Sequence, residues 1–247
     1  MLIDAALFLA AFLAGALNAV AGGGTFLTFP TLIFAGVPPI QANASSTVAL
    51  FPGSFAALAA YRKDLARLKT VHIPAFFAIS LLGGLLGALL LLWTPQAVFQ
   101  GIIPWLLLFA TVLFAFGKPI SAWISARWTL TMGPLLVVQF FVALYGGYFG
   151  GGIGILMLAS LGLFGLKDLH VMNGLKTLVA GALNAVATVT FIVAGAVDWR
   201  AVAIMLPAAV LGGYGGAALA RRVPQPILRG FILTVAVLIT GYFFVEG

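Results

Sequence analysis

Polar side chains suited to holding an oxyanion follow two interruptions of very apolar sequence. Each interruption is a run of three glycines, and each is followed, after a short apolar arm, by an asparagine and a threonine four residues apart. Residues four apart share one face of a helix, and their uncharged amide and hydroxyl donors can hold an anion and still release it. We predict a substrate site from these residues: Gly22, Gly23, Gly24, Thr25, Asn43 and Thr47 in the first copy, and Gly150, Gly151, Gly152, Asn173 and Thr177 in the second.

Three consecutive glycines predict a broken helix at each triplet. Glycine weakens a helix by roughly 1 kcal/mol relative to alanine, and lipid cannot satisfy the backbone groups that a break frees. The break must then be buried in protein or face a polar cavity. The alternative is that the glycines only let helices approach closely, as small residues do in many membrane bundles. The repetition favours a functional interpretation, since Asn43 lies 19 residues after Gly24 and Asn173 lies 21 after Gly152.

Lys176 adds a positive charge to the second copy only. It is the one basic residue inside a predicted span, about 12–14 Å from the start of that span. A buried ammonium group costs roughly 2.5 kcal/mol or more without a partner, and no predicted span contains a carboxylate. A translocating anion would be a suitable counter-ion. The alternative is that Lys176 reaches the cytoplasmic interface along its own stem; its counterpart in the first copy is Ser46.

Other polar residues are weaker evidence for a substrate site. The two asparagine–threonine pairs could equally cap the hairpins or bond to neighbouring helices, and His72 and His170 lie at span ends, where an interfacial histidine is expected rather than a proton relay. The triplets match neither a dinucleotide fingerprint nor a phosphate-binding loop, and no nucleophile lies with a histidine and an acid. We therefore predict no catalytic residue, no metal, no cofactor and no enzyme. Weaker additions to the substrate site are Asn18, Gln139 and Asn184.

Composition defines the class of protein. Of the 247 residues, 63% are hydrophobic and 7% charged, and the mean hydropathy of +1.21 excludes a soluble globular domain. The net charge of +7 could suit nucleic acid, but the basic residues lie in short loops between apolar segments, which is the positive-inside pattern. We predict an all-α polytopic membrane protein. Its partners are the lipid bilayer and a small inorganic or organic anion, without nucleic acid, and a homo-oligomer is left open.

The apolar segments repeat one plan. Each repeat begins with a broken or re-entrant hairpin at its glycine triplet and continues with three transmembrane helices. The arm 25–34 covers only about 15 Å as a helix, half of the hydrocarbon core. We predict a first repeat at 1–117, a cytoplasmic linker at 118–129 and a second repeat at 130–247, together one integral membrane domain. The full spans are expected near 41–61, 73–93, 97–117, 170–197, 201–220 and 227–245.

Charge predicts that the second repeat is inverted. Placing the basic loop 62–69 in the cytoplasm, with each hairpin entering and leaving on one side, also places Lys118, Lys167 and Arg221 there and Arg200 outside. Three crossings per repeat then turn the second repeat upside down. Hairpins entering from opposite sides meet near the bilayer midplane, where inverted-repeat transporters place substrate sites with helix N-termini directed at anions. An anion site between the two hairpins is the prediction.

Two further glycine-rich segments, 83–88 and 212–217, occupy the same place in each repeat. Small residues at this spacing let helices approach closely in membranes. We predict that these segments pack helices rather than bind substrate.

With these motifs in view, the chain resembles the TauE/SafE sulfite exporter family over nearly its whole length. The resemblance implies transport of sulfite or organosulfur anions across the bacterial inner membrane, commonly outward, although members differ in substrate. Related thiosulfate carriers use cysteines along their path, and this chain has none, which argues against that variant. The motifs are Ala-Gly-Gly-Gly-Thr at 21–25, Gln-Ala-Asn-Ala-Ser-Ser-Thr at 41–47, Gly-Gly-Tyr-Phe-Gly-Gly-Gly at 146–152, Met-Asn-Gly-Leu-Lys-Thr at 172–177 with Asn184 downstream, and Gly-Ala-Val-Asp-Trp at 195–199.

We therefore expect a multi-pass transporter of the cell inner membrane that exports small sulfur-containing anions, sulfite or an organosulfonate. The alternatives are an anion channel and an ion-coupled importer of similar anions. The predicted spans contain no Asp or Glu and hence no obvious proton carrier. A monoanion leaving a negative-inside cell gains about 2.3 kcal/mol per 100 mV, so export could run as uniport driven by the potential.

Overall fold

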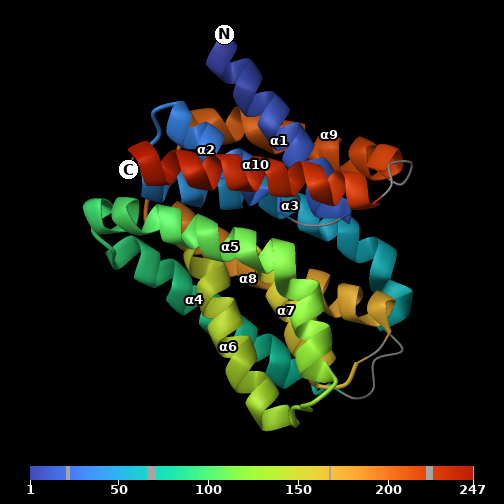
Figure 1. Cartoon of the computed structure of the whole chain (residues 1–247). Coiled ribbons are helices and arrows are strands. Elements are labelled where there is room, and N and C mark those ends of the chain that lie inside the picture. Colours follow the sequence, from blue (N-terminus) through green and yellow to red (C-terminus); the bar gives the residue numbers. More distant parts are fainter. Residues whose placement is uncertain (21–22, 66–70, 167, 221–224, 247) are drawn as a thin grey trace.

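The fold is all-helical. A computed structural model describes the backbone of residues 1–20, 23–65, 71–166, 168–220 and 225–246, and in these residues it contains helices and no strand (Figure 1). The predicted helical class is confirmed. The helices are α1 (Leu2–Val20), α2 (Thr25–Phe34), α3 (Pro39–Leu65), α4 (Ile73–Trp93), α5 (Gln96–Ser125), α6 (Met132–Tyr148), α7 (Ile153–Leu163), α8 (Leu169–Val193), α9 (Trp199–Ala220) and α10 (Gln225–Glu246).

Several helices have the length and apolarity of membrane spans. Within the described residues, Ile73–Trp93, Gln96–Gly117 and Val171–Val193 are long and apolar enough to cross a bilayer. Large apolar side chains such as Trp93, Trp105 and Val193 lie exposed on the outside, where lipid rather than water suits them. The architecture is that of a polytopic membrane protein.

Both predicted helix breaks are present. The first lies between α1 and α2 and the second between α6 and α7. Gly23, Gly150 and Gly152 have φ of +94°, +80° and +76°, a left-handed conformation that glycine adopts at no steric cost. Gly22 lies outside the described residues. The triplets therefore end helices instead of continuing them.

The predicted end of one other span is wrong. The expected span 97–117 agrees with the apolar span Gln96–Gly117, although helix α5 itself continues to Ser125, whereas α8 ends at Val193, four residues before the expected 197. A helix can leave the hydrocarbon without ending, so the charge of Lys118 does not terminate α5. Helix α8 ends early because Gly195 has φ of +65°, the usual geometry of a glycine that closes a helix. The division into repeats at 118–129 stays a prediction.

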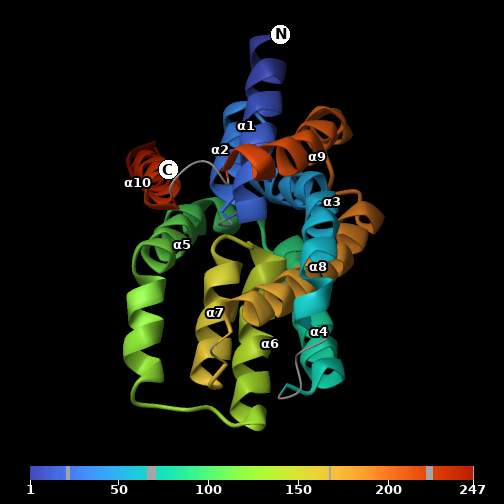
Figure 2. The ribbon, with the colours of Figure 1, turned by 90° about the vertical axis from the view of Figure 1, so that its right-hand side faces the viewer.

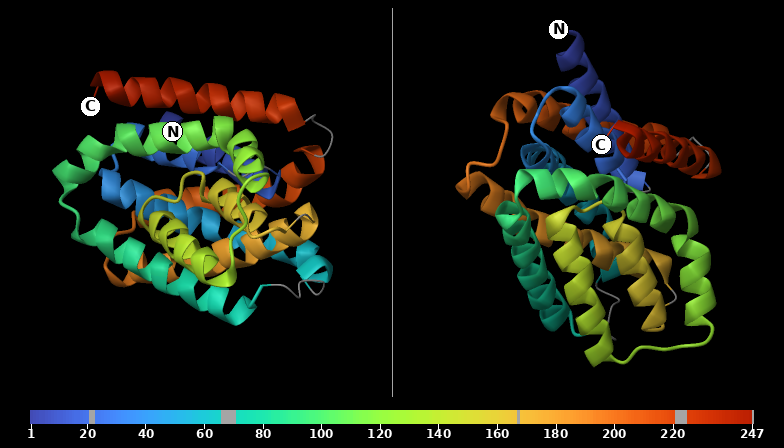
Figure 3. Two further views of the ribbon diagram at one scale, coloured as in Figure 1. Left: turned by 60° about the horizontal axis from the view of Figure 1, so that its bottom comes forward. Right: turned by 60° about the vertical axis from the view of Figure 1, so that its left-hand side comes forward.

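Helix contacts recur with the halves exchanged. Helix α1 packs on α9 as α6 packs on α4, α3 packs on α9 as α8 packs on α4, and α5 packs on α7 as α10 packs on α2. Two pairs, α3 with α8 and α5 with α10, contact their own counterparts, and the second pair lies side by side (Figure 3). A buried hydrogen bond of 3.1 Å joins Thr111 of α5 to Thr240 of α10. This is the pattern of a two-fold relation between helices α1–α5 and α6–α10, while its inversion across a membrane stays a prediction.

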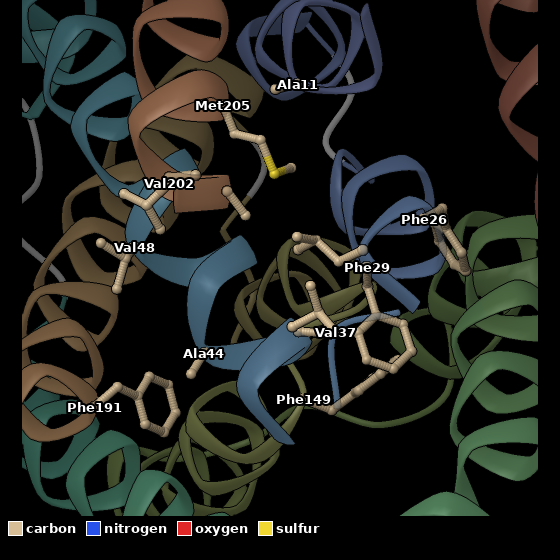
Figure 4. Packing of buried hydrophobic residues seen from close by; sticks show 14 of the residues in the cluster. Ala11, Phe26, Phe29, Val37, Ala44, Val48, Phe149, Phe191, Val202 and Met205 are labelled. Carbon is tan, nitrogen blue, oxygen red and sulfur yellow. The ribbon is translucent and has the colours of Figure 1, made fainter. Parts of the chain in front are cut away.

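The two broken hairpins approach each other from opposite ends of the molecule. In Figure 2, α1 runs from the N-terminus toward the middle and α2 returns, whereas α6 runs inward from the far end and α7 returns. Phe29 of α2 packs against Phe149, directly before the second triplet, with ring centroids 5.5 Å apart (Figure 4). The first hairpin thus contacts the second break inside the protein.

The glycine-rich faces pack helices, as predicted. A Cβ at Gly83 would lie 2.7 Å from the carbonyl oxygen of Phe140 on α6, and one at Gly212 would overlap the backbone of Phe12 on α1. The pairs α4–α6 and α1–α9 therefore make backbone-to-backbone contacts that any side chain would obstruct.

Candidate functional site

The first break holds a backbone N–H through a side chain of the preceding helix. Asn18, one turn before the triplet, accepts a hydrogen bond from the Gly24 N–H through Oδ1 at 2.8 Å. Thr25 follows as the first residue of α2 and is half-buried. Because the first N–H groups of a helix lack intrahelical partners, the Asn18 side chain takes a place that a ligand could otherwise occupy.

Ser46 is likewise engaged inside the first half. Its hydroxyl lies 2.6 Å from that of Thr28 on α2, and both residues are buried. Thr28 also bonds to the carbonyl oxygen of Gly24. Helices α2 and α3 are therefore joined by a hydrogen bond between two neutral hydroxyl groups.

The second break has no counterpart of the Asn18 bond among the described residues, because Gly146 stands at the corresponding position, four residues before its triplet. Helix α7 begins after Gly152 without a side-chain cap, as α2 does after Gly24. Two of the backbone bonds that open α7, from the Ile153 N–H to the Gly150 oxygen at 3.5 Å and from the Leu156 N–H to the Gly152 oxygen at 3.4 Å, are longer than those that open α2, at 3.0–3.1 Å. The first N–H groups of α7 are therefore the more weakly bonded of the two sets.

Lys176 lies along this uncapped turn. A Cβ placed on Gly154 would lie 3.3 Å from Lys176 Cδ and 3.9 Å from Nζ, so the side chain passes directly over α7. Lys176 is half-buried, and it forms no ion pair with a carboxylate among the described residues. A cation beside the positive end of a helix is unfavourable by itself. An anion bound between them would relieve both charges.

Asn43 contacts the other side of the same break. Its Nδ2 donates to the carbonyl oxygen of Tyr148, the last residue of α6, at 3.0 Å. Its Oδ1 is buried and has no hydrogen-bond partner in the described part of the chain. Thr47, one turn later, donates its hydroxyl to the Asn43 carbonyl at 3.0 Å. Asn43 and Thr47 thus lie one turn apart on α3, and of the two only Asn43 bonds to a residue of the second half.

The remaining predicted residues divide into two groups. Asn173, Thr177 and Asn184 are half-buried on α8, the helix that carries Lys176. Gln139 is fully buried and donates to the Ser80 hydroxyl on α4 at 2.9 Å, about 13 Å along α6 from Tyr148. Gln139 thus joins two helices away from the break.

Of the two histidines predicted at span ends, the structure describes the side chain of one. His72 is exposed and caps α4 by accepting from the Ala75 N–H at 3.2 Å, which agrees with a histidine at the interface. The side chain of His170 lies outside the described residues.

Sequence reasoning missed two groups that shape the second break. The Tyr145 hydroxyl donates to the carbonyl oxygen of Gly151 at 2.7 Å and holds the triplet in place. The Tyr148 carbonyl fixes Asn43. The sequence does place both tyrosines within one or two turns of the glycines. Tyrosine is common in apolar spans, however, and the group that the Tyr145 hydroxyl binds is a backbone carbonyl, which no sequence pattern marks.

Comparisons with known proteins agree with this architecture. The family model of the sulfite exporter TauE/SafE matches residues 7–243. A probable membrane transporter protein, ORF9, from a Sinorhizobium species is 31% identical over 94% of this chain and 88% of its own length. A probable membrane transporter protein of Haemophilus influenzae is 27% identical over 96% of this chain and 92% of its own length.

A third relative, the probable membrane transporter protein YfcA of Escherichia coli K12, is 28% identical over 95% of this chain and 87% of its own length. No solved structure matches the chain. These names indicate a transporter rather than an enzyme. With broken hairpins and a family match across nearly all of its helices, the chain belongs to the TauE/SafE sulfite exporter family of membrane transporters.

Proposed function

We propose that this transporter exports small sulfur-containing anions, sulfite or an organosulfonate, across the cell inner membrane, and binds them at the second glycine break. The observation that carries the proposal is the position of Lys176 along the uncapped first turn of α7. The family name supports the substrate class. An inward-pointing cation without a carboxylate partner is a functional feature by default in a membrane.

The binding chemistry follows from these groups. Free N–H groups at a helix N-terminus and the helix dipole attract an anion. Lys176 adds a full charge, and Asn173 and Thr177 on the same helix add neutral donors close by. A single lysine with amide and hydroxyl groups gives an affinity that still permits release, which transport requires.

The opposed hairpins support a site at the bilayer midplane. We place the basic loops in the cytoplasm and take α1–α5 and α6–α10 as inverted repeats, so that each hairpin enters from its own side (Figure 2). In inverted-repeat transporters, one repeat rocks against the other around a fixed central site. The α3–α8 and α5–α10 contacts are then the surfaces on which the repeats move.

The substrate assignment is tested by binding to wild-type protein and Lys176→Ala. Sulfite, a sulfonate, sulfate and a carboxylate are titrated against both proteins, with Ser46→Ala as the matched control at the equivalent position. We expect Lys176→Ala to weaken sulfite binding about tenfold to a hundredfold, since a hydrogen bond to a charged group contributes about 1.5–3 kcal/mol. Equal sulfite affinity in wild type and Lys176→Ala would remove Lys176 from the site.

The driving force is tested in proteoliposomes. Export driven by the potential predicts that efflux follows an imposed voltage, because each charge gains about 2.3 kcal/mol per 100 mV, and ignores a pH gradient. Efflux that tracks pH and disregards voltage would contradict uniport. Dependence on sodium would indicate a coupled importer, and unitary currents an anion channel.

A further inference from the structure

We propose that Asn43 selects anions that carry a hydrogen-bond donor of their own, such as a hydroxyl or ammonium group on a sulfonate or the proton of hydrogensulfite. This inference rests on the proposed function and adds a requirement to it. The acid group of the ligand meets α7 and Lys176, while its donor meets the side-chain oxygen of Asn43.

The orientation of the Asn43 amide is fixed by its neighbour. Nδ2 faces the carbonyl oxygen of Tyr148 at 3.0 Å, and a carbonyl can only accept. The opposite orientation would place two acceptors against each other. Oδ1 is therefore the free end of the side chain, and it can only accept a hydrogen bond.

This acceptor has no partner among the described residues. Asn43 is 1% exposed and its Oδ1 is buried without a hydrogen bond. The nearest hydroxyl along the helix, that of Thr47, donates to the Asn43 backbone carbonyl instead. A buried acceptor without a partner is destabilising, so a ligand that brings its own donor is bound more tightly than one that does not.

Asn43 and Lys176 lie at the two helix ends that flank one break. Asn43 bonds to the last residue of α6, the negative end of that helix, and Lys176 lies over the first turn of α7, the positive end of the next. Only residues 149–152 separate these ends. The break therefore presents an acceptor on one side and donors on the other, and a purely accepting anion leaves the first side unsatisfied.

Two sulfonates of equal charge and similar size test this inference. 2-Hydroxyethanesulfonate and propane-1-sulfonate differ by a hydroxyl in place of a methyl group. We expect wild-type protein to bind the hydroxyl compound about tenfold more tightly. In Asn43→Leu the two affinities should become equal. Thr188→Val, which removes a second buried hydroxyl that has no hydrogen-bond partner among the described residues, should keep the wild-type ratio.

The wild-type ratio is decisive even where Asn43→Leu does not fold. Equal affinity of the two sulfonates for wild type would overturn the role of Asn43, and so would failure of both to bind. Sulfite binding in the same assay, with its dependence on Lys176, judges the proposed function separately. The titrations are repeated with sodium replaced by a bulky organic cation. Loss of the preference without sodium would also overturn the inference, because Asn43 would then hold a cation.

Discussion

The two glycine breaks share a scaffold and differ in chemistry. In the first, Asn18 accepts from the Gly24 N–H directly before α2, and the Ser46 hydroxyl bonds to that of Thr28. In the second, Gly146 and Lys176 occupy the corresponding positions, so that the Asn18 bond has no counterpart and a cation lies beside α7. The polar groups of the first break bond within its own half, and we propose that those of the second bind the ligand.

This difference separates two roles of a repeated fold. The shared contacts, such as α1 on α9 and α6 on α4, stabilise the helix bundle in both halves. The unshared residues sit where the helices are broken. If the halves are repeats, as we propose, the exchange of Ser46 for Lys176 between them is enough to make the proposed anion site one-sided.

The largest expected effect tests the shared scaffold. Gly83→Val and Gly212→Val each place a side chain against the backbone of a neighbouring helix. We expect both to destabilise the protein by more than about 3 kcal/mol and to abolish a folded peak in size-exclusion chromatography. Gly101→Val, whose Cβ meets nothing within 4 Å, is the control. A folded, stable Gly212→Val beside a collapsed Gly83→Val would show that the halves are not equivalent scaffolds.

A second prediction moves the charge between halves. The double variant Ser46→Lys with Lys176→Ser keeps the net charge but places the ammonium group beside α2. We expect its sulfite affinity to stay at least about tenfold below wild type, because a charge-assisted contact is lost and the Gly24 N–H remains bonded to Asn18. Wild-type affinity, measured by calorimetry, would mean that the two breaks are interchangeable.

A third change disturbs Lys176 without removing it. Gly154→Val introduces atoms against the Lys176 stem, which lies 3.3 Å from the new Cβ. We expect sulfite binding to weaken roughly fivefold, a loss of about 1 kcal/mol. Gly101→Val again serves as the control in the same titration. Unchanged affinity would mean that anion binding does not require the Lys176 side chain to lie over Gly154.

The smallest expected effect concerns the first break. Asn18→Ala removes the bond to the Gly24 N–H and should lower the free energy of unfolding by about 1 kcal/mol. The unfolding temperature should fall by about 2–4 °C. Sulfite affinity should not change, since we propose that the anion binds at the second break. A loss of affinity as large as that of Lys176→Ala would contradict the assignment of the site to the second half.

Local signals in the sequence predicted the breaks but not their neighbours. The glycines of the triplets and Gly36 break or end helices through their own backbone conformation, so they can be recognised without knowing their neighbours. The arm Thr25–Phe34 has the expected ends. The bond from Asn43 to Tyr148 joins residues 105 positions apart, which no local pattern encodes. The end of α8 was missed because hydropathy marks the limits of hydrocarbon, whereas glycine geometry and hydrogen bonds decide where a helix stops.

Position in the sequence also could not tell which polar residues bond to protein and which are left for a ligand. Asn18 and Gln139 are predicted additions to the anion site, and they stay predictions; in the structure Asn18 bonds to the Gly24 N–H and Gln139 to the Ser80 hydroxyl. A polar residue in an apolar segment needs a partner of some kind. Whether that partner is backbone, a side chain or a ligand depends on which helices meet there.

The most direct test is to locate the anion. Crystals grown with selenite, an analogue of sulfite whose selenium scatters anomalously, give its position without assumptions about affinity. We expect an anomalous peak within hydrogen-bond distance of Lys176 Nζ, beside the first turn of α7. A peak at the N-terminus of α2 with none at α7 would contradict it.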